Sequence, residues 1–202
     1  MEEVRGVVFD VGNVLFTWDP RFLYERLIDD DRALDAFLRE VVTHEWHFQH
    51  DAGRPFSETS AELVAKHPQH RELIELWGPR FNESLGPPVE GMIDLVEELD
   101  AKGVPLFAIT NFSGEFWGPF RDTQPVFDRF RDIVVSGTEQ LMKPHREIYE
   151  LALRRFGLPA GQLIFIDDRA ENVAGAKAVG MRGHLFRDAP TLQAELKELG
   201  LI

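Results

Sequence analysis

The sequence predicts an α/β protein with a Rossmann-like parallel sheet, helices on both faces of the sheet, and an inserted α-helical cap. Three observations predict this class. Apolar, strand-like runs alternate with helical patterns through residues 87–202, as in sheets whose parallel strands are joined by helices. One further strand-like run opens the chain, and a wholly helical stretch follows it. The length of 202 residues allows one core domain that carries an insertion.

Five apolar runs have the length and composition of buried strands. They cover residues 7–10, 104–110, 132–137, 163–168 and 182–186. Helical patterns follow the later runs or lie between them, and all four of these patterns end at a glycine, which commonly closes a helix. The helical patterns cover residues 87–103, 145–157, 171–180 and 191–200.

Residues 18–86, here called the helical insert, interrupt this alternation. The insert contains no strand of the sheet, and proline-containing joints lie at both of its ends, at 18–20 and 86–88. Its helical patterns cover residues 20–28, 31–49, 57–67 and 70–81. We therefore expect a core domain of residues 1–17 and 87–202 and a cap domain of residues 18–86.

Composition excludes several classes of function. The chain has no cysteine, so it contains neither disulfides nor a catalytic thiol. No apolar run approaches the roughly 18 residues of a membrane span, and the acidic start of the chain is unlike a signal peptide, so we expect a cytoplasmic protein. The formal net charge of −13 argues against general nucleic-acid binding. The oligomeric state stays open.

Acidic and polar side chains follow the predicted strands. Asp10 ends the first strand, Thr110 and Asn111 end the second, and Asp167 and Asp168 end the fourth. Ligands of open parallel sheets bind at the carboxyl ends of the strands, so the three carboxylates should converge if the first and fourth strands are neighbours. Carboxylates held together repel one another unless a cation lies among them, and oxygen ligands favour Mg2+.

A phosphate-binding arrangement accompanies these acids. Lys143 lies just before a predicted helix, and Thr110 and Asn111 offer a hydroxyl, an amide and backbone N–H groups at a strand-to-helix turn. A carboxylate such as Asp10 attacks phosphorus without a base to activate it. The residues together favour phosphoryl transfer to Asp10, with a small phosphate ester as the substrate.

Four short motifs occur in a characteristic order: FDVGNV at 9–14, ITN at 109–111, MKP at 142–144 and IDDRAENVAGAKAVGM at 166–181. In this set the chain resembles the haloacid dehalogenase (HAD) superfamily, and in particular a phosphatase subgroup with D-x-G-N in the first motif. That subgroup includes sugar-phosphate phosphatases and relatives of the N-terminal domain of soluble epoxide hydrolase. The resemblance implies a sheet of order 3-2-1-4-5 and places the helical insert where the family has its C1 cap.

The resemblance also implies roles for the motif residues. Asp10 would be the nucleophile that becomes an aspartyl-phosphate, and Thr110 and Lys143 would bind the transferring phosphoryl group, with Asn111 close by. Asn172 would brace the loop of the fourth motif. The Mg2+ ligands would be Asp10, the backbone carbonyl of Gly12 and Asp168, with Asp167 assisting through water.

Gly12 departs from the family pattern. Most phosphatases of the family have there an aspartate that protonates the leaving group and then activates water. Glycine keeps the carbonyl but lacks that acid, and general acid–base catalysis is typically worth about 10²–10⁴-fold in rate. We expect turnover to depend on the acidity of the leaving group or on help from the substrate, so that sugar 1-phosphates react faster than 6-phosphates. Water or a residue of the insert would then assist breakdown of the aspartyl-phosphate.

Two other functions stay open. A 2-haloacid dehalogenase would use Asp10 on carbon and needs no metal, and a regulatory protein would bind phosphate but turn over little. His44, His47 and His50 recur every three residues, a spacing that suits a metal site, although a polar helix face that partly lines the cleft explains it more simply. The tryptophans are expected to pack in the core or at the joints, with sugar stacking by Trp18 or Trp46 as an alternative.

Overall fold

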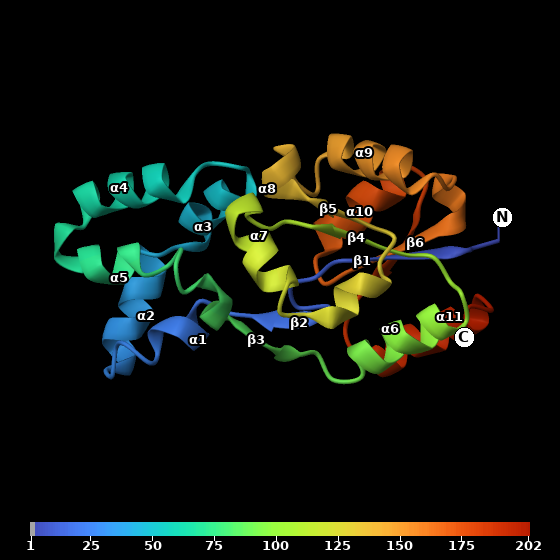
Figure 1. Cartoon of the computed structure of the whole chain (residues 1–202), viewed down its shortest axis with the longest axis horizontal. Helices are drawn as coiled ribbons and strands as arrows, with labels where there is room; N and C mark the ends of the chain where they lie inside the picture. Colours follow the sequence, from blue (N-terminus) through green and yellow to red (C-terminus); the bar gives the residue numbers. More distant parts are fainter. Residues whose placement is uncertain (1–2) are drawn as a thin grey trace.

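The structure of the protein is a computed structural model that describes residues 3–202. Five parallel strands form its main sheet in the order β5-β4-β1-β6-β7 (Figure 1). The order 3-2-1-4-5 predicted for the five strand-like runs is therefore confirmed. The strands are β1 (Gly6–Phe9), β4 (Leu106–Thr110), β5 (Asp132–Val135), β6 (Leu163–Asp167) and β7 (Arg182–Leu185).

The central strand β1 is buried on both faces of the sheet, as expected for a parallel sheet covered by helices. Val8 pairs with Phe107 of β4 on one side and with Phe165 of β6 on the other. Val7 and Phe9 belong to one hydrophobic cluster, whereas Val8 belongs to a second cluster on the opposite face. This period-two alternation directs successive side chains of β1 into two separate cores.

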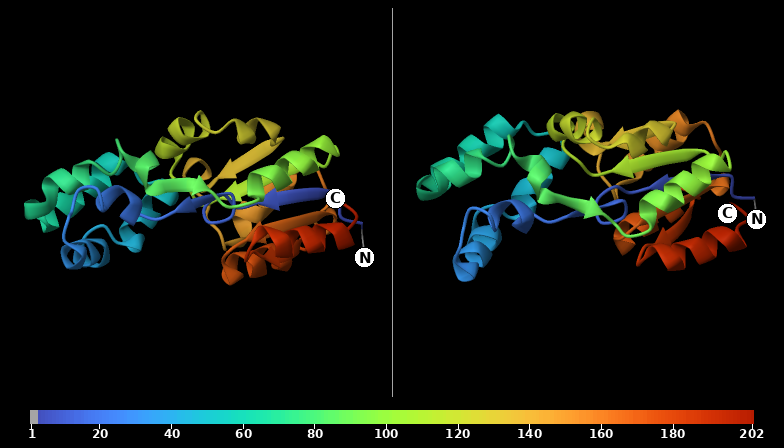
Figure 2. Two further views of the ribbon diagram at one scale, coloured as in Figure 1. Left: turned by 90° about the horizontal axis from the view of Figure 1, so that it is seen from below. Right: turned by 60° about the horizontal axis from the view of Figure 1, so that its bottom comes forward.

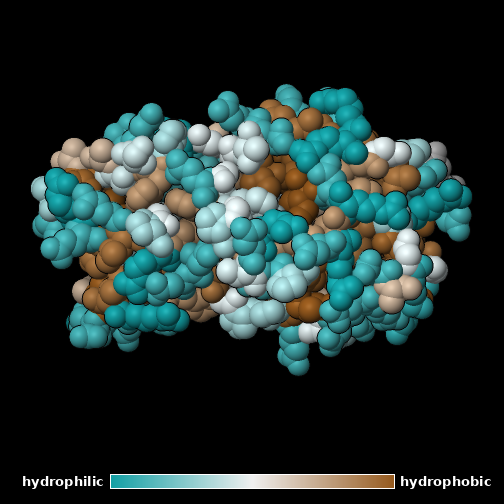
Figure 3. Space-filling model, in the orientation of Figure 1, coloured by the Kyte–Doolittle hydropathy of each residue, from teal (hydrophilic) through white to brown (hydrophobic). Residues whose placement is uncertain are grey.

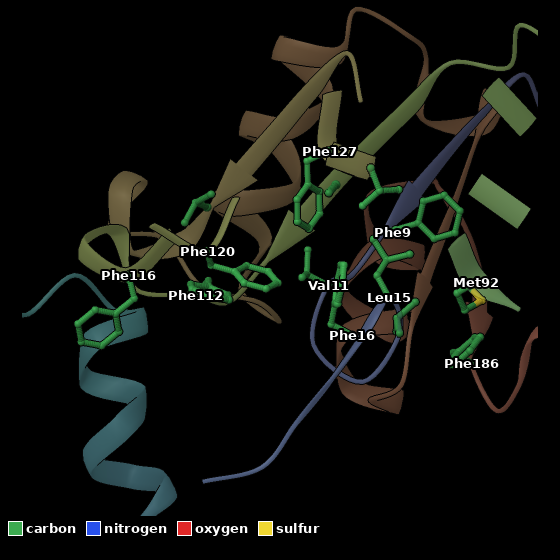
Figure 4. Close-up of a cluster of buried hydrophobic side chains, with 14 of the residues drawn as sticks. Phe9, Val11, Leu15, Phe16, Met92, Phe112, Phe116, Phe120, Phe127 and Phe186 are labelled. Carbon is green, nitrogen blue, oxygen red and sulfur yellow. The ribbon is translucent and has the colours of Figure 1, made fainter. Parts of the chain in front are cut away.

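Helices cover both faces of the sheet. The smaller cluster packs under α9 and α10, and the larger one involves α6, α7 and α11. Phe116 of α7 points toward a helix of the insert, so aromatic packing continues from the core into the insert (Figure 4). These helices are α6 (Met92–Ala101), α7 (Gly114–Arg121), α8 (Ser136–Glu139), α9 (Arg146–Phe156), α10 (Ala170–Ala178) and α11 (Ala189–Glu198).

The sequence analysis did not predict α7. Its sequence contains Gly114, Gly118 and Pro119, all poor helix formers. Tertiary packing compensates, because Phe116 and Phe120 are buried and the Ser113 side chain caps the first turn by accepting a hydrogen bond from the Glu115 N–H.

The helical insert contains no strand of the main sheet, as predicted. The prediction of one long helix over residues 31–49 is wrong. Residues 31–49 form two helices rather than one, because the β-branched run at Val41–Thr43 ends the first helix and Thr43 caps the second. Thr43 Oγ1 accepts the Trp46 N–H at 3.2 Å. The helices of the insert are α1 (Arg21–Tyr24), α2 (Asp31–Glu40), α3 (His44–Asp51), α4 (Phe56–Lys66) and α5 (Arg71–Glu75), with 3₁₀ turns at η1 (Pro68–His70) and η2 (Phe81–Ser84).

The two joints of the insert pair with each other. Residues Phe16–Trp18 (β2) and Leu85–Pro88 (β3) form an antiparallel two-stranded ribbon, and Thr17 Oγ1 donates a hydrogen bond to the Pro87 carbonyl at 3.0 Å. The sequence analysis predicted stiff turns at these positions rather than strands. The ribbon lies between the main sheet and the helices of the insert (Figures 1 and 2).

The helices of the insert lie at one end of the molecule, and the start of β1 and the C-terminus lie at the opposite end of the core (Figures 1 and 2). Hydrophilic residues cover most of the face in Figure 3, and hydrophobic residues show there in smaller patches. Within residues 3–202, no helix combines the length and the apolar character that crossing a bilayer requires.

Candidate active site

Three carboxylates converge at the carboxyl ends of two neighbouring strands. Asp10 directly follows β1, Asp167 ends β6, and Asp168 comes next. The Asp10 N–H continues the ladder between these strands by donating to the Ile166 carbonyl at 2.8 Å. One oxygen from each carboxylate lies within 4.8 Å of the others. Asp10 and Asp167 are buried and Asp168 is exposed, so the cluster opens to solvent on the side of Asp168.

Lys143 lies against this cluster. Its Nζ atom is 2.8 Å from Asp10 Oδ2 and 2.7 Å from Asp167 Oδ2, and its side chain is completely buried. Asn111 fixes the lysine from the end of β4. The Asn111 amide donates to the Lys143 carbonyl at 3.0 Å and accepts the Lys143 N–H at 2.9 Å. Both polar atoms of the Asn111 side chain therefore support the loop that carries the lysine.

The electrostatics of the cluster indicate an excess of negative charge. Burial raises the pKa of Asp10 well above its ordinary value, the Lys143 ammonium opposes that rise, and Asp167 and Asp168 add to it. Burial raises the pKa of Asp168 as well. Burial alone would lower the pKa of Lys143, but Asp10 and Asp167 outweigh it and raise that pKa. If all three carboxylates are ionised, they and the single ammonium carry a net charge of −2, which a divalent ion with oxygen ligands would offset.

Asp167 is held by hydrogen bonds at both oxygens. The Asn172 amide donates to Oδ1 at 3.0 Å and to Oδ2 at 3.1 Å, and the Arg169 N–H donates to Oδ1 at 2.9 Å. Lys143 occupies Oδ2 as well. The structure thus brings Asn172 to the loop that it was predicted to brace, and Asp167 has little capacity left for a direct metal bond.

Thr110 lies at the end of β4, next to Asn111. Its side chain is 1% exposed, and its Oγ1 atom has no hydrogen-bond partner among the described residues. Because buried hydroxyl groups are normally hydrogen-bonded, this orphaned oxygen is free to bind a ligand atom.

Gly12 lies in the turn that follows Asp10. The turn is closed by a bridge between Gly12 and Phe16 and by Asn13, which has a φ of 56° and accepts the Trp18 N–H on its side-chain oxygen. A Cβ atom added at Gly12 would meet nothing within 4 Å. The missing carboxylate therefore leaves open space beside Asp10.

A cavity of about 210 Å³ lies over the carboxylates, between the core and the helical insert. The motif residues at its floor include Asp10, Gly12, Asn111, Lys143 and Asp168. The rest of its lining is largely aromatic or apolar and comes from both parts of the chain. The sequence analysis missed most of these residues, which are Trp18, His44, His47, Phe48, Asp51, Phe81, Leu85, Phe112 and Arg169.

The three histidines of α3 are not a metal site. Among residues 3–202, only Asp10, Asp167 and Asp168 form a group of three side chains close enough together to hold one metal ion. His44 and His47 line the cavity, but His47 and His50 are buried, so the predicted polar face is wrong for these two. Burial lowers the pKa of His47 well below its ordinary value and that of His50 to about 4. Both imidazoles are therefore neutral and pack as aromatic rings.

Trp18 supplies one wall of the cavity from the ribbon. Its ring stacks on His47 at a centroid distance of 4.8 Å, and His47 stacks in turn on Phe81 at 5.6 Å. Across the cavity, the Arg169 guanidinium lies 5.8 Å from the Phe48 ring, joining the fourth motif to α3. Trp46 and Trp77 are buried, in agreement with a packing role.

Comparison with known proteins agrees with this geometry. The family model of the haloacid dehalogenase-like hydrolases matches residues 4–180. A sesquiterpene phosphatase from Aspergillus oryzae is 30% identical over 201 residues, which cover 96% of each chain. A phosphoglycolate phosphatase from Yersinia pseudotuberculosis is 31% identical over 198 residues, covering 88% of this chain and 78% of the relative.

The fold is shared with solved structures of the same family. An HAD family enzyme from Bacteroides thetaiotaomicron, solved as a magnesium complex, superposes with a TM-score of 0.72 at 17% identity, covering 93% of this chain and 96% of the other. This likeness concerns the fold alone. Together with the family match and the two phosphatase relatives, it shows that this chain is an enzyme that belongs to the haloacid dehalogenase-like hydrolases.

Proposed function

We propose that the protein is a Mg2+-dependent phosphatase that cleaves a small phosphate ester through an aspartyl-phosphate on Asp10. The observation that carries the proposal is the buried contact of Lys143 Nζ with both Asp10 and Asp167 beside the more exposed Asp168. A carboxylate next to an ammonium suits phosphoryl transfer, since the first attacks phosphorus and the second binds the phosphoryl oxygens.

Each side chain of the site has its own role in the proposed reaction. Asp10 Oδ attacks phosphorus, while Lys143 Nζ and the orphaned Thr110 hydroxyl bind the phosphoryl oxygens. Asn111 acts through Lys143, because both polar atoms of its side chain hold the lysine backbone. Asn172 keeps Asp167 in place next to the lysine. Water then releases phosphate from Asp10.

The donor set at the carboxyl ends of β1 and β6 fits Mg2+. Asp10, Asp168 and the backbone carbonyl of Gly12 would hold the ion, and Asp167 would assist through water because its own oxygens are already hydrogen-bonded. When bound, Mg2+ offsets the charge on the phosphoryl oxygens.

The wall of the cavity bears on the substrate class. Trp18, Phe48, Phe81, Leu85 and Phe112 present aromatic and apolar surface opposite the carboxylates. Such a wall suits an ester whose organic group is apolar or stacks on rings, as the flat faces of sugars do. A sugar 1-phosphate is one candidate. The phosphate of an apolar alcohol is the second, favoured by this wall and by the sesquiterpene phosphatase relative.

Two alternatives have weaker support. A 2-haloacid dehalogenase would direct Asp10 at carbon and needs no metal, so it gives no role to a cluster of three carboxylates. A regulatory protein that binds phosphate without turnover would need no nucleophile next to a buried lysine.

A phosphate-release screen with and without Mg2+ tests the proposal. The panel contains sugar 1- and 6-phosphates, phosphoglycolate, a sesquiterpene alcohol phosphate, an acyl phosphate and an aryl phosphate, with chloride release from 2-chloro acids measured in parallel. We expect phosphate release that stops when Mg2+ is chelated. Chloride release without Mg2+ would establish the dehalogenase instead, and phosphate binding with no turnover of any ester would establish the regulatory protein.

A further inference from the structure

Asp51 is a buried carboxylate to which the proposed mechanism gives no task. It is the last residue of α3 and is 2% exposed, yet it lines the same cavity as Asp10 and Lys143. Its Oδ1 atom has no hydrogen-bond partner among the described residues. A buried carboxyl oxygen without a partner is costly, and the residue that carries it lines the cavity in which an ester bound at Asp10 would lie.

The core holds Asp51 in place. Ser136, at the start of α8, donates a hydrogen bond from its Oγ to the Asp51 carbonyl at 2.6 Å, and the backbone N–H of Ser113 also interacts favourably with the Asp51 carboxylate. At the same junction Gly137 lets the end of α3 and the start of α8 approach closely, because a Cβ atom at Gly137 would lie 3.0 Å from the His50 carbonyl. The end of α3 is thus fixed against the edge of the sheet that carries the active site.

We propose that Asp51 is the general acid and base of this enzyme and replaces the carboxylate that is absent at Gly12. The inference rests on the proposed phosphatase function. It joins two observations at one cavity, namely the open space at Gly12 and the unpartnered carboxyl oxygen of Asp51.

The reaction balances in two steps. Asp10 Oδ forms a bond to phosphorus while the bond from phosphorus to the ester oxygen breaks, and that oxygen keeps the electron pair and takes the proton of Asp51, leaving as an alcohol. Asp51, now a carboxylate, then takes a proton from water as the water oxygen attacks phosphorus. The bond from phosphorus to Asp10 breaks, and phosphate, free Asp10 and protonated Asp51 are restored.

The surroundings of Asp51 suit a group that both gives and takes a proton. Burial raises the pKa of Asp51 to about 7, against the Lys143 ammonium and the Ser113 N–H, which lower it. The titratable or charged groups facing Asp51 are Lys143 from the core and His47 one turn earlier in α3, whose Nε2 lies 3.6 Å from Asp51 Oδ1. Because burial keeps His47 neutral, this contact is not an ion pair. A catalytic acid works best when its pKa lies near the working pH.

The test compares esters that differ in their need for a proton. Wild type and Asp51→Asn are assayed for kcat/KM with an alkyl phosphate and with 4-nitrophenyl phosphate, whose leaving group departs without protonation. We expect Asp51→Asn to lower kcat/KM for the alkyl ester by about 10²–10⁴-fold and for the aryl ester by less than about tenfold. With the aryl ester, pre-steady-state kinetics should show a burst of nitrophenol, because breakdown of the aspartyl-phosphate has lost its base.

Three further variants separate catalysis from folding. Glu45→Gln makes the same chemical change at an exposed position of α3 and should leave both esters unaffected. Gly12→Asp combined with Asp51→Asn should recover alkyl-ester hydrolysis, because the space at Gly12 admits a carboxylate. Asp10→Asn should abolish hydrolysis of both esters.

The outcomes distinguish the two proposals. If Asp51→Asn lowers kcat/KM for both esters equally, or for neither, Asp51 is not the acid, although the phosphatase proposal stands as long as Asp10→Asn is inactive. If Asp10→Asn keeps wild-type activity, or if the wild type hydrolyses no ester, the phosphatase proposal and the role of Asp51 fail together.

Discussion

At the scale of single residues, the site depends on the charge of Asp10. Asp10→Asn keeps the shape of the side chain but removes the attacking anion, so we expect turnover to fall by at least about 10³-fold. The fold should survive, because the amide also relieves the repulsion from Asp167 and Asp168 that raises the pKa of Asp10. Steady-state kinetics and thermal unfolding of the purified variant check both statements, and wild-type activity in Asp10→Asn would contradict the mechanism.

Gly12 offers a second test at this scale. Gly12→Asp should fold normally, since an added Cβ meets nothing within 4 Å, and it keeps the backbone carbonyl. If Asp51 already supplies the proton, a second acid adds little, so we expect kcat/KM for alkyl esters to change by less than about tenfold, a small part of what acid–base catalysis contributes. A gain of more than about a hundredfold would mean that the native site lacks an acid.

Individual residues also show what the sequence could predict. Asp10, Asp167 and Asp168 could be assigned to one point because each follows a strand, and the ends of neighbouring parallel strands meet. Asp51 could not be assigned in this way. Its position depends on the hydrogen bond from Ser136, which is 85 residues away in the chain, and no local pattern near Asp51 indicates that contact.

At the scale of elements, the ends of β1 and β6 build the proposed metal site. Asp168 is the accessible carboxylate of the cluster, whereas Asp167 is fully engaged with Lys143, Asn172 and the Arg169 N–H. Asp168→Asn should therefore weaken Mg2+ binding by about tenfold or more, with a matching loss of activity. Asp167→Asn should change Mg2+ affinity less and instead disturb Lys143. Isothermal titration with Mg2+ measures the affinities, and equal affinities in wild type and Asp168→Asn would remove Asp168 as a ligand.

The helices of the insert illustrate where periodicity fails. A single helix was expected over residues 31–49 because apolar residues recur on both sides of Val41–Thr43, but the chain turns there and Thr43 starts a new helix. This break reorients α3 so that its last residue, Asp51, meets α8. Local propensity only partly predicts this break between α2 and α3. The break nevertheless determines which side chains of the insert reach the cavity.

At the scale of the whole molecule, buried ionisable groups oppose one another in their effect on stability. His47 and His50 have a lowered pKa in the folded protein, so their contribution to stability is present above their ordinary pKa and is lost as the pH falls. Asp51 has a raised pKa, so its contribution is present below its ordinary pKa and is lost as the pH rises through about 7. Between about pH 4 and pH 7 the two effects therefore oppose each other, because a rising pH restores the contribution of the histidines and removes that of Asp51.

The contribution of Asp51 can be isolated by thermal unfolding. Asp51→Asn replaces a group that is charged at high pH by one that is neutral at every pH. At pH 5 the folded wild-type carboxyl is already protonated, since burial raises its pKa to about 7, so the melting temperatures of the two proteins should differ less there than at pH 8. At pH 8 the wild type holds a buried charge, and we expect Asp51→Asn to melt about 5 °C higher.

Circular dichroism melts at pH 5, 6, 7 and 8, with chelator present, measure this difference, and Glu45→Gln on the exposed side of α3 serves as the matched control. If Asp51 is a catalytic group that costs the wild type stability, Asp51→Asn should melt higher than wild type by an amount that grows with pH. The same variant should lose alkyl-ester hydrolysis. A difference in melting temperature that is constant from pH 5 to pH 8 would mean that Asp51 does not titrate in this range, and a group that stays in one protonation state cannot act as both acid and base at neutral pH.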